Sequence, residues 1–112
     1  MTETPAGEKN RKLGPMGDRV VFENDRVRIW ELVIPPGEDS NIHEHLLDYV
    51  LVILDGDRVA AVQEPDTGAT LPPYFEADVV SGQAVFVPRG GIETARNIGK
   101  VPYSEIIIEL KD

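Results

Sequence analysis

The sequence predicts an all-β domain built as a sandwich or a barrel. Two observations carry this prediction. The chain is a series of short runs rich in β-branched and aromatic residues, and turns rich in glycine, proline, asparagine and aspartate separate these runs. No window of eleven or more residues shows the apolar repeat of a helix. The 112 residues suit one compact domain.

The first half of the domain holds four expected strands, at residues 18–23, 26–34, 48–54 and 58–64. Asn24 and Asp25 separate the first two, and a Pro-Pro-Gly turn ends the second. The third strand, DYVLVIL, is apolar on both faces after its first two residues, which is typical of a strand buried within a fold. Asp55-Gly56 then predicts a two-residue hairpin, with residues 58–64 as the returning strand.

The second half holds four more expected strands, at residues 74–80, 83–87, 92–97 and 102–110. Turn residues at 66–68 and 72–73 precede the first of them. The last strand alternates, because successive side chains of a strand point to opposite faces. One face carries Ile106, Ile108 and Leu110, and the other carries Glu105 and Glu109.

Residues 1–17 are polar and carry glycine and proline, which indicates a flexible N-terminal arm ahead of a folded domain at residues 18–112. Such an arm is either disordered or packed across a partner subunit. The sequence leaves both arrangements open.

The charge balance excludes two classes of partner. Eleven basic residues face twenty acidic ones, for a formal charge of -9. Binding to nucleic acid or to an anionic membrane surface needs a basic face, so neither partner is expected. The chain has no cysteine and its N-terminus has no apolar run, so we expect a cytoplasmic protein in a reducing compartment.

The only two histidines of the chain, His43 and His45, stand two positions apart. Residues i and i+2 of a strand point to the same side, so the two imidazoles would project together and could share a metal ion. Taken alone, the spacing is equally compatible with two surface histidines on the loop after Pro-Pro-Gly.

The residues around this pair resemble the first motif of the cupin superfamily. The segment GEDSNIHEHLLDYVLVILDG, which begins at Gly37, has the motif's glycine, H-x-H and closing glycine at the expected spacing. The segment GQAVFVPRGGIETARN, which begins at Gly82, is similar to the second motif, with its glycine, P-x-G and final asparagine. The resemblance covers roughly residues 18–111, and the flanks look like those of small single-domain bacterial cupins.

This resemblance implies a small antiparallel β-barrel of the jelly-roll type, with a metal site inside it where the two motifs meet. His43 and His45 match the two histidine ligands of the first motif. Two ligand positions depart from the family pattern. Tyr49, preceded by Asp48, stands where the family usually has glutamate, and Glu93 stands where the second motif has its histidine.

The altered set is still suited to a divalent metal. His43, His45 and Glu93 would supply the two histidines and one carboxylate found in non-haem Fe(II) oxygenases, and would leave coordination positions open. The carboxylate favours Fe(II) or Mn(II), and Zn or Ni is possible. Tyr49 is expected to line the pocket, or to donate a hydrogen bond to bound substrate or to a metal-bound oxygen. Tyr49 and Glu93 are therefore the catalytic candidates.

Three further residues are candidates for the substrate pocket. Arg28 or Arg96, if it points inward, would clamp a substrate carboxylate. Asp48 is a weaker candidate, either in the pocket or as a different third ligand. Another alternative is a barrel that binds no metal, in which Glu93 forms an ordinary ion pair with Arg96.

Two hypotheses of function follow. The first is a metal-dependent enzyme acting on a small oxygen-bearing organic molecule; the ligand set favours O₂-dependent oxidation of the dioxygenase type over isomerase or lyase chemistry. The second is a non-catalytic cupin that acts as a small-molecule binding module. Because small cupins commonly pair, the resemblance also implies a homodimer.

Overall fold

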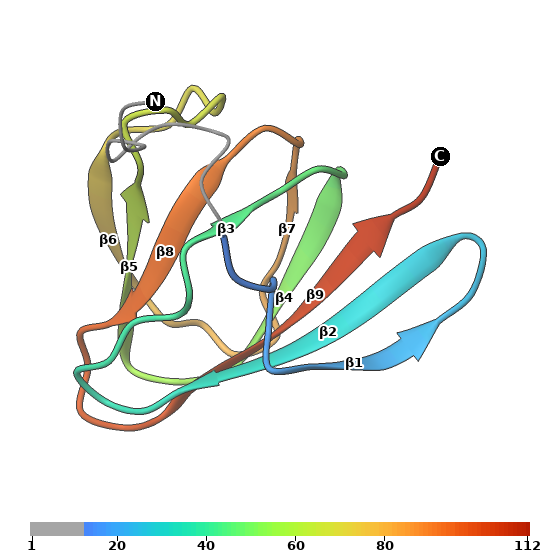
Figure 1. The fold of residues 1–112 in the computed structure, drawn as a ribbon. Coiled ribbons are helices and arrows are strands. Elements are labelled where there is room, and N and C mark those ends of the chain that lie inside the picture. Colours follow the sequence, from blue (N-terminus) through green and yellow to red (C-terminus); the bar gives the residue numbers. More distant parts are fainter. Residues whose placement is uncertain (1–12) are drawn as a thin grey trace.

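The computed structural model describes residues 13–112, which form two antiparallel β-sheets facing each other (Figure 1). The five-stranded sheet has the order β1-β2-β9-β4-β7, and the four-stranded sheet has the order β3-β8-β5-β6. The strands are β1 (Arg19–Glu23), β2 (Val27–Ile34), β3 (His43–Glu44), β4 (Tyr49–Asp55), β5 (Arg58–Gln63), β6 (Tyr74–Asp78), β7 (Ala84–Val87), β8 (Ile92–Asn97) and β9 (Tyr103–Leu110). The all-β prediction is confirmed. This part of the chain contains no helix that could cross a membrane.

All eight predicted strands are present, and β3 is an additional short strand that begins at His43. The predicted hairpin at Asp55-Gly56 is wrong. β4 pairs with β7 and β9, whereas β5 pairs with β6 and β8, so this corner carries the chain from one sheet to the other. Gly56 has a φ of +146°, and a Cβ there would lie 2.9 Å from Cδ1 of Tyr103, so the corner requires glycine.

The predicted arm falls largely on residues 1–12, which lie outside the described residues. Residues 13–17 run along the domain, where the Gly14 N–H donates to the Ile42 carbonyl at 2.8 Å. Gly17 is buried, and a Cβ there would lie 2.8 Å from the Glu31 carbonyl oxygen. The division into an arm and a domain stays a prediction.

The hydrophobic core joins the two sheets. Its fully buried members are Leu32 on β2, Ile34 on β2, Ile53 on β4 and Tyr103 on β9. Val59, from the opposite sheet, packs against them. Burial of each large apolar side chain stabilises the fold by about 1.5–3 kcal/mol, so this cluster holds the sheets together.

β9 lies between β2 and β4, and its two faces differ in a way that matters for function. The inward face carries Tyr103, Glu105, Ile107 and Glu109, all of them buried. The half-buried isoleucines point outward. The central strand of this sheet therefore presents two carboxyl groups to the interior of the molecule.

The outside of the five-stranded sheet carries many apolar residues, beside the ion pair of Arg19 with Glu31. One row of paired residues crosses all five of its strands: Phe22, Ile29, Ile108, Val50 and Phe86. We call this row the outer apolar row. Its two edge residues are the most exposed, with Phe22 at 51% and Phe86 at 57%.

Candidate metal centre

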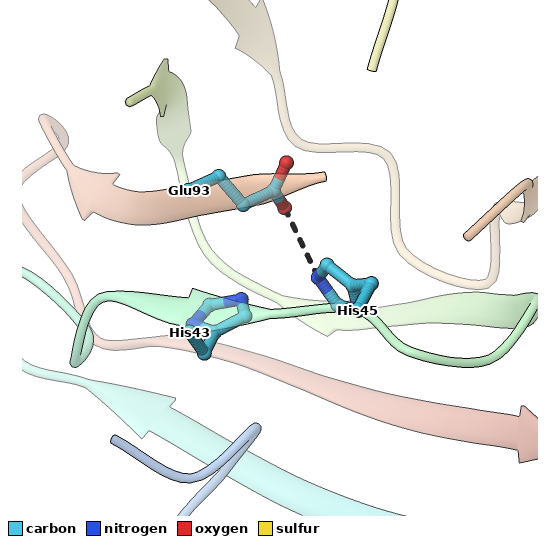
Figure 2. Close-up of side chains that lie close together, drawn as sticks. All are labelled: His43, His45 and Glu93. Carbon is cyan, nitrogen blue, oxygen red and sulfur yellow. Dashed lines mark ion pairs between the residues drawn. The ribbon is translucent and has the colours of Figure 1, made fainter. Parts of the chain in front are cut away.

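The three ligands predicted from the sequence lie together inside the molecule (Figure 2). β3 pairs with β8, and in this register His43 stands directly opposite Glu93. His45 follows two positions later and points to the same side as His43. The candidate ligand atoms of the three side chains all lie within 4.8 Å of one another.

The imidazole ring of His45 is buried without a hydrogen-bond partner among the described residues. Among residues 13–112, neither of its ring nitrogens forms a hydrogen bond, and Nε2 lies 3.4 Å from Oε2 of Glu93. The ring stacks on Tyr49, with the ring centres 3.9 Å apart and the planes inclined by 14°. An unpartnered buried polar atom costs about 1–3 kcal/mol, so this ring is suited to a ligand that the protein itself does not provide.

His43 is held in one tautomer. Its Nδ1 lies 2.7 Å from the carbonyl oxygen of Asn41. A carbonyl oxygen only accepts hydrogen bonds, so Nδ1 carries the proton and Nε2 keeps its lone pair. Burial, together with the neighbouring His45, lowers the pKa of His43, and the ring remains in the neutral form that metal binding requires.

Glu93 is oriented by a chain of hydrogen bonds. Gln63 Nε2 donates to Glu93 Oε1 at 2.6 Å, and Thr67 Oγ1 donates to Gln63 Oε1 at 2.9 Å. The Ile92 N–H in turn donates to Thr67 Oγ1 at 2.9 Å. Burial alone would raise the pKa of Glu93, but the contacts with His45, Gln63 and His43 outweigh it and lower that pKa, so the group is ionised.

Gln63 and Thr67 are the functional residues that sequence reasoning missed. Gln63 meets Glu93 because β5 pairs with β8 in a register that places the two side by side. Thr67 reaches Gln63 from the loop after β5. Neither residue belongs to a motif, so no sequence feature could have indicated its role.

The donor set fits a divalent metal ion. Nitrogen and oxygen donors lie about 2.0–2.2 Å from zinc, so two donors on one ion are no more than about 4.4 Å apart. The spread of 4.8 Å closes to this limit if the side chains move by a few tenths of an ångström. Two imidazoles and one carboxylate suit Fe, Mn, Co, Ni or Zn, and leave positions open for a small molecule.

A cavity of about 380 Å³ lies between the two sheets beside these residues. Its polar lining consists of His43, His45, Tyr49, Gln83, Glu93, Tyr103 and Glu105. The rest of its wall is apolar and includes Leu51, Val59, Phe75 and Val85, and none of the described residues that line it is a lysine or an arginine. Such a cavity is typical of a site for a small organic molecule.

Tyr49 lines this cavity, and its hydroxyl forms no hydrogen bond within the described part of the chain. Burial raises the pKa of Tyr49 well above its ordinary value, and the charges of Glu93 and Glu105 add to this shift. The phenol therefore stays protonated. It is a hydrogen-bond donor facing the cavity and not an anionic metal ligand.

The structure places the other three candidate residues elsewhere, which corrects the expected substrate clamp. Arg28 pairs with Glu23 at 3.1 Å and with Glu109 at 3.4 Å. Asp48 accepts hydrogen bonds from the Arg89 backbone and side chain. Neither Arg28 nor Asp48 lines the cavity.

Arg96 also lies away from the cavity. It follows inward-facing Ala95 on β8, so its side chain points outward, where it pairs with Asp39 at 2.9 Å. The alternative of a Glu93–Arg96 ion pair is wrong for the same reason, because Glu93 points inward.

No protein-family model matches the sequence, and no curated protein matches it. Among solved structures, a cupin domain from Bordetella pertussis Tohama I is similar, with 24% identity, coverage of 95% of this chain and 100% of that chain, and a TM-score of 0.72. An RmlC-like cupin family protein from Methanocaldococcus jannaschii, with a double-stranded β-helix fold, has 18% identity, coverage of 99% and 93%, and a TM-score of 0.66.

A third similar structure is the DMSP lyase DddQ from Ruegeria pomeroyi DSS-3, with 19% identity and a TM-score of 0.58. The likeness covers 80% of this chain and 40% of that chain. The two antiparallel sheets and these likenesses confirm the predicted jelly-roll barrel. The chain therefore has the fold of the cupin superfamily, as its two motifs predicted.

Proposed function

We propose that this protein is a cytoplasmic, metal-dependent cupin enzyme that acts on a small oxygen-bearing organic molecule. Its metal ligands are His43, His45 and Glu93. The observation that carries the proposal is the buried ring of His45, which lacks a hydrogen-bond partner among the described residues and lies beside the carboxylate of Glu93. The absence of cysteine supports a reducing compartment.

The residues around the centre have distinct tasks. A divalent metal, when bound, supplies Lewis acidity or redox chemistry next to the cavity. The protein holds the ligands in place through Asn41 and Gln63, offers the Tyr49 hydroxyl to the substrate, and excludes water with apolar walls. Because two histidines and one carboxylate are the set of non-haem Fe(II) oxygenases, we favour O₂-dependent oxidation with Fe(II) or Mn(II) over chemistry with Zn or Ni.

Two alternatives have support of their own. One similar structure is a DMSP lyase, which favours lyase or isomerase chemistry at the same centre. The apolar cavity alone would also suit a non-catalytic module that binds a small molecule. Metal content separates the binding module from the two enzyme hypotheses.

The decisive experiment replaces Glu93 by alanine and measures metal content after anaerobic reconstitution with Fe(II). Loss of one of three ligands is expected to lower metal affinity at least tenfold, whereas the unmutated protein retains about one ion per chain. Glu44→Ala is the matched control, because Glu44 lies between the two histidines and points to the other side of β3. Glu93→His is expected to retain a metal with a different preferred ion.

Two outcomes would contradict the proposal. Unchanged occupancy in Glu93→Ala would remove Glu93 from the centre. If the unmutated protein bound no metal, the binding module would be the better description.

We also propose that the protein is a homodimer, with two copies meeting at the outer apolar row. A two-fold axis places the same patch of both copies face to face, so an apolar row that crosses a whole sheet is complementary to itself. The outside of the other sheet carries ion pairs such as Arg58–Glu76 and is suited to water. We expect Ile108→Lys to convert a dimer to a monomer in a molar-mass measurement; a monomeric unmutated protein would refute the proposal.

A further inference from the structure

The cavity contains a second acidic group that the metal centre does not use. Glu105 lies on the inward face of β9 with 6% of its surface exposed. The hydroxyl of Tyr103 donates to its Oε1 at 2.5 Å. Within residues 13–112 this is the only hydrogen bond of the carboxyl group, and the side chain lines the cavity, so the other oxygen, Oε2, remains available as an acceptor.

Glu105 lies at a different level of the sheet from the metal centre. On β4, Tyr49 stands opposite Glu109 and Ile53 stands opposite Glu105. Four positions along a strand span roughly 13 Å, and Tyr49 is the residue whose ring stacks on His45. The cavity therefore has a polar group near each end, with apolar side chains such as Leu51 between them.

The charges of the lining decide which ligands suit this arrangement. Among residues 13–112, the titratable groups that face the cavity are His43, His45, Tyr49, Glu93, Tyr103 and Glu105. None of them is a lysine or an arginine, so this part of the chain supplies no fixed cation that would compensate an anionic ligand near Glu105. A carboxylate placed there would meet a second acidic group in a poorly solvated site, which is unfavourable.

The volume of the cavity limits the size of the ligand. An apolar cavity of about 150 Å³ is enough to bind benzene. The cavity here, at about 380 Å³, is more than twice as large. It therefore has room for one substituted ring or for an aliphatic body of similar size.

We infer that Glu105 and Tyr103 form a recognition subsite that selects uncharged, carbon-rich ligands carrying a hydroxyl or N–H donor. The donor binds to Oε2 of Glu105, and Tyr103 holds the carboxyl group in the orientation that leaves this oxygen free. The orientation of the ligand, with its oxygen-bearing end toward His43, His45 and Glu93, rests on the proposed function. The subsite itself does not.

The test compares three probes that share one ring: phenol, benzoate and toluene. Binding to the metal-free protein is followed by chemical-shift changes at about pH 8. Phenol is expected to bind at least tenfold more tightly than benzoate and several-fold more tightly than toluene, because only phenol combines a neutral ring with a donor. Glu105→Leu is expected to weaken phenol binding about tenfold while toluene binding is kept.

Two variants sharpen the test. Glu105→Gln keeps an acceptor and removes the charge, so it should narrow the difference between phenol and benzoate. Glu109→Gln is the matched control: Glu109 is buried on the same face of β9, but it is bonded to Trp30 and Arg28 and does not line the cavity. This variant should bind all three probes as the unmutated protein does.

The inference is overturned if the unmutated protein does not bind phenol, or binds benzoate equally well. It is also overturned if a folded Glu105→Leu variant, checked by circular dichroism, binds phenol normally. Zinc titration of the same samples is independent of these results. If the unmutated protein does not bind zinc, the proposed metal centre is refuted, and the inference about the subsite is unaffected.

Discussion

Two glutamates line one cavity in opposite environments. Glu93 receives a hydrogen bond from Gln63 and faces two imidazoles, and its pKa lies below the ordinary value. Glu105 receives a single hydrogen bond from a tyrosine hydroxyl, and burial, with a smaller effect of the Glu93 charge, raises its pKa to about 7. The same residue type thus behaves differently because its partners differ.

The two carboxyl groups differ in protonation, and this difference suits them to different roles in the cavity. A carboxyl group that stays ionised is suited to hold a cation, which is the role proposed for Glu93. A carboxyl group with a pKa near neutrality exchanges protons readily, and a pair of groups with such divergent pKa values is typical of sites that carry out acid–base chemistry.

The largest expected effect that would test this contrast is on stability. Between pH 4.5 and about 7 the folded state holds a proton on Glu105 that the unfolded state has released, so the free energy of unfolding falls as the pH rises through this window. The loss is on the order of 3 kcal/mol. The Glu105→Gln variant has no ionisable group at this position, so this pH-dependent loss of stability should be absent. Urea unfolding of both metal-free proteins across this range measures the difference, and parallel pH profiles would show that the two carboxyl groups do not differ as described.

A smaller effect is expected on the other side of the comparison. Gln63→Leu removes the donor to Glu93 Oε1, which raises the pKa of Glu93 and should lower zinc affinity about 10- to 100-fold. Competition with a chelator measures this affinity. Gln83→Leu is the control, because Gln83 lines the same cavity without bonding to Glu93. Equal zinc affinities of the two variants would show that Gln63 does not support the ligand.

Motif spacing and alternation could predict much of this architecture from the sequence. The strands followed from apolar runs between turns, and the motif spacing matched His43, His45 and Glu93 to ligand positions that the structure brings together. The prediction of a hairpin at Asp55-Gly56 was wrong, because a tight turn with glycine occurs both between paired strands and at a corner between two sheets. Only the pairing of β4 with β7 and β9 distinguishes the two.

The inward-facing residues were harder to predict. Alternation placed Glu105 and Glu109 on a common face, yet it could not show that this face is buried, since acidic residues usually point to water. Here Glu109 is satisfied by Arg28 and Trp30, and Glu105 by Tyr103. These partners come from neighbouring strands or from the strand itself, and only the sheet register reveals them.

The loop after β5 has a consequence for motion. Its Thr67 bonds to Gln63, and its Gly68 N–H donates to the carbonyl of Gly90 at 2.8 Å, while the Gly90 N–H donates to the carbonyl of His45 at 2.8 Å. These hydrogen bonds connect the loop both to Gln63, beside Glu93, and to the backbone of His45. The loop and the candidate metal centre should therefore unfold locally as one cooperative unit. If a cation binds inside the barrel, amide hydrogen exchange in this loop should therefore slow. Exchange at the loop would then show whether the interior site is occupied.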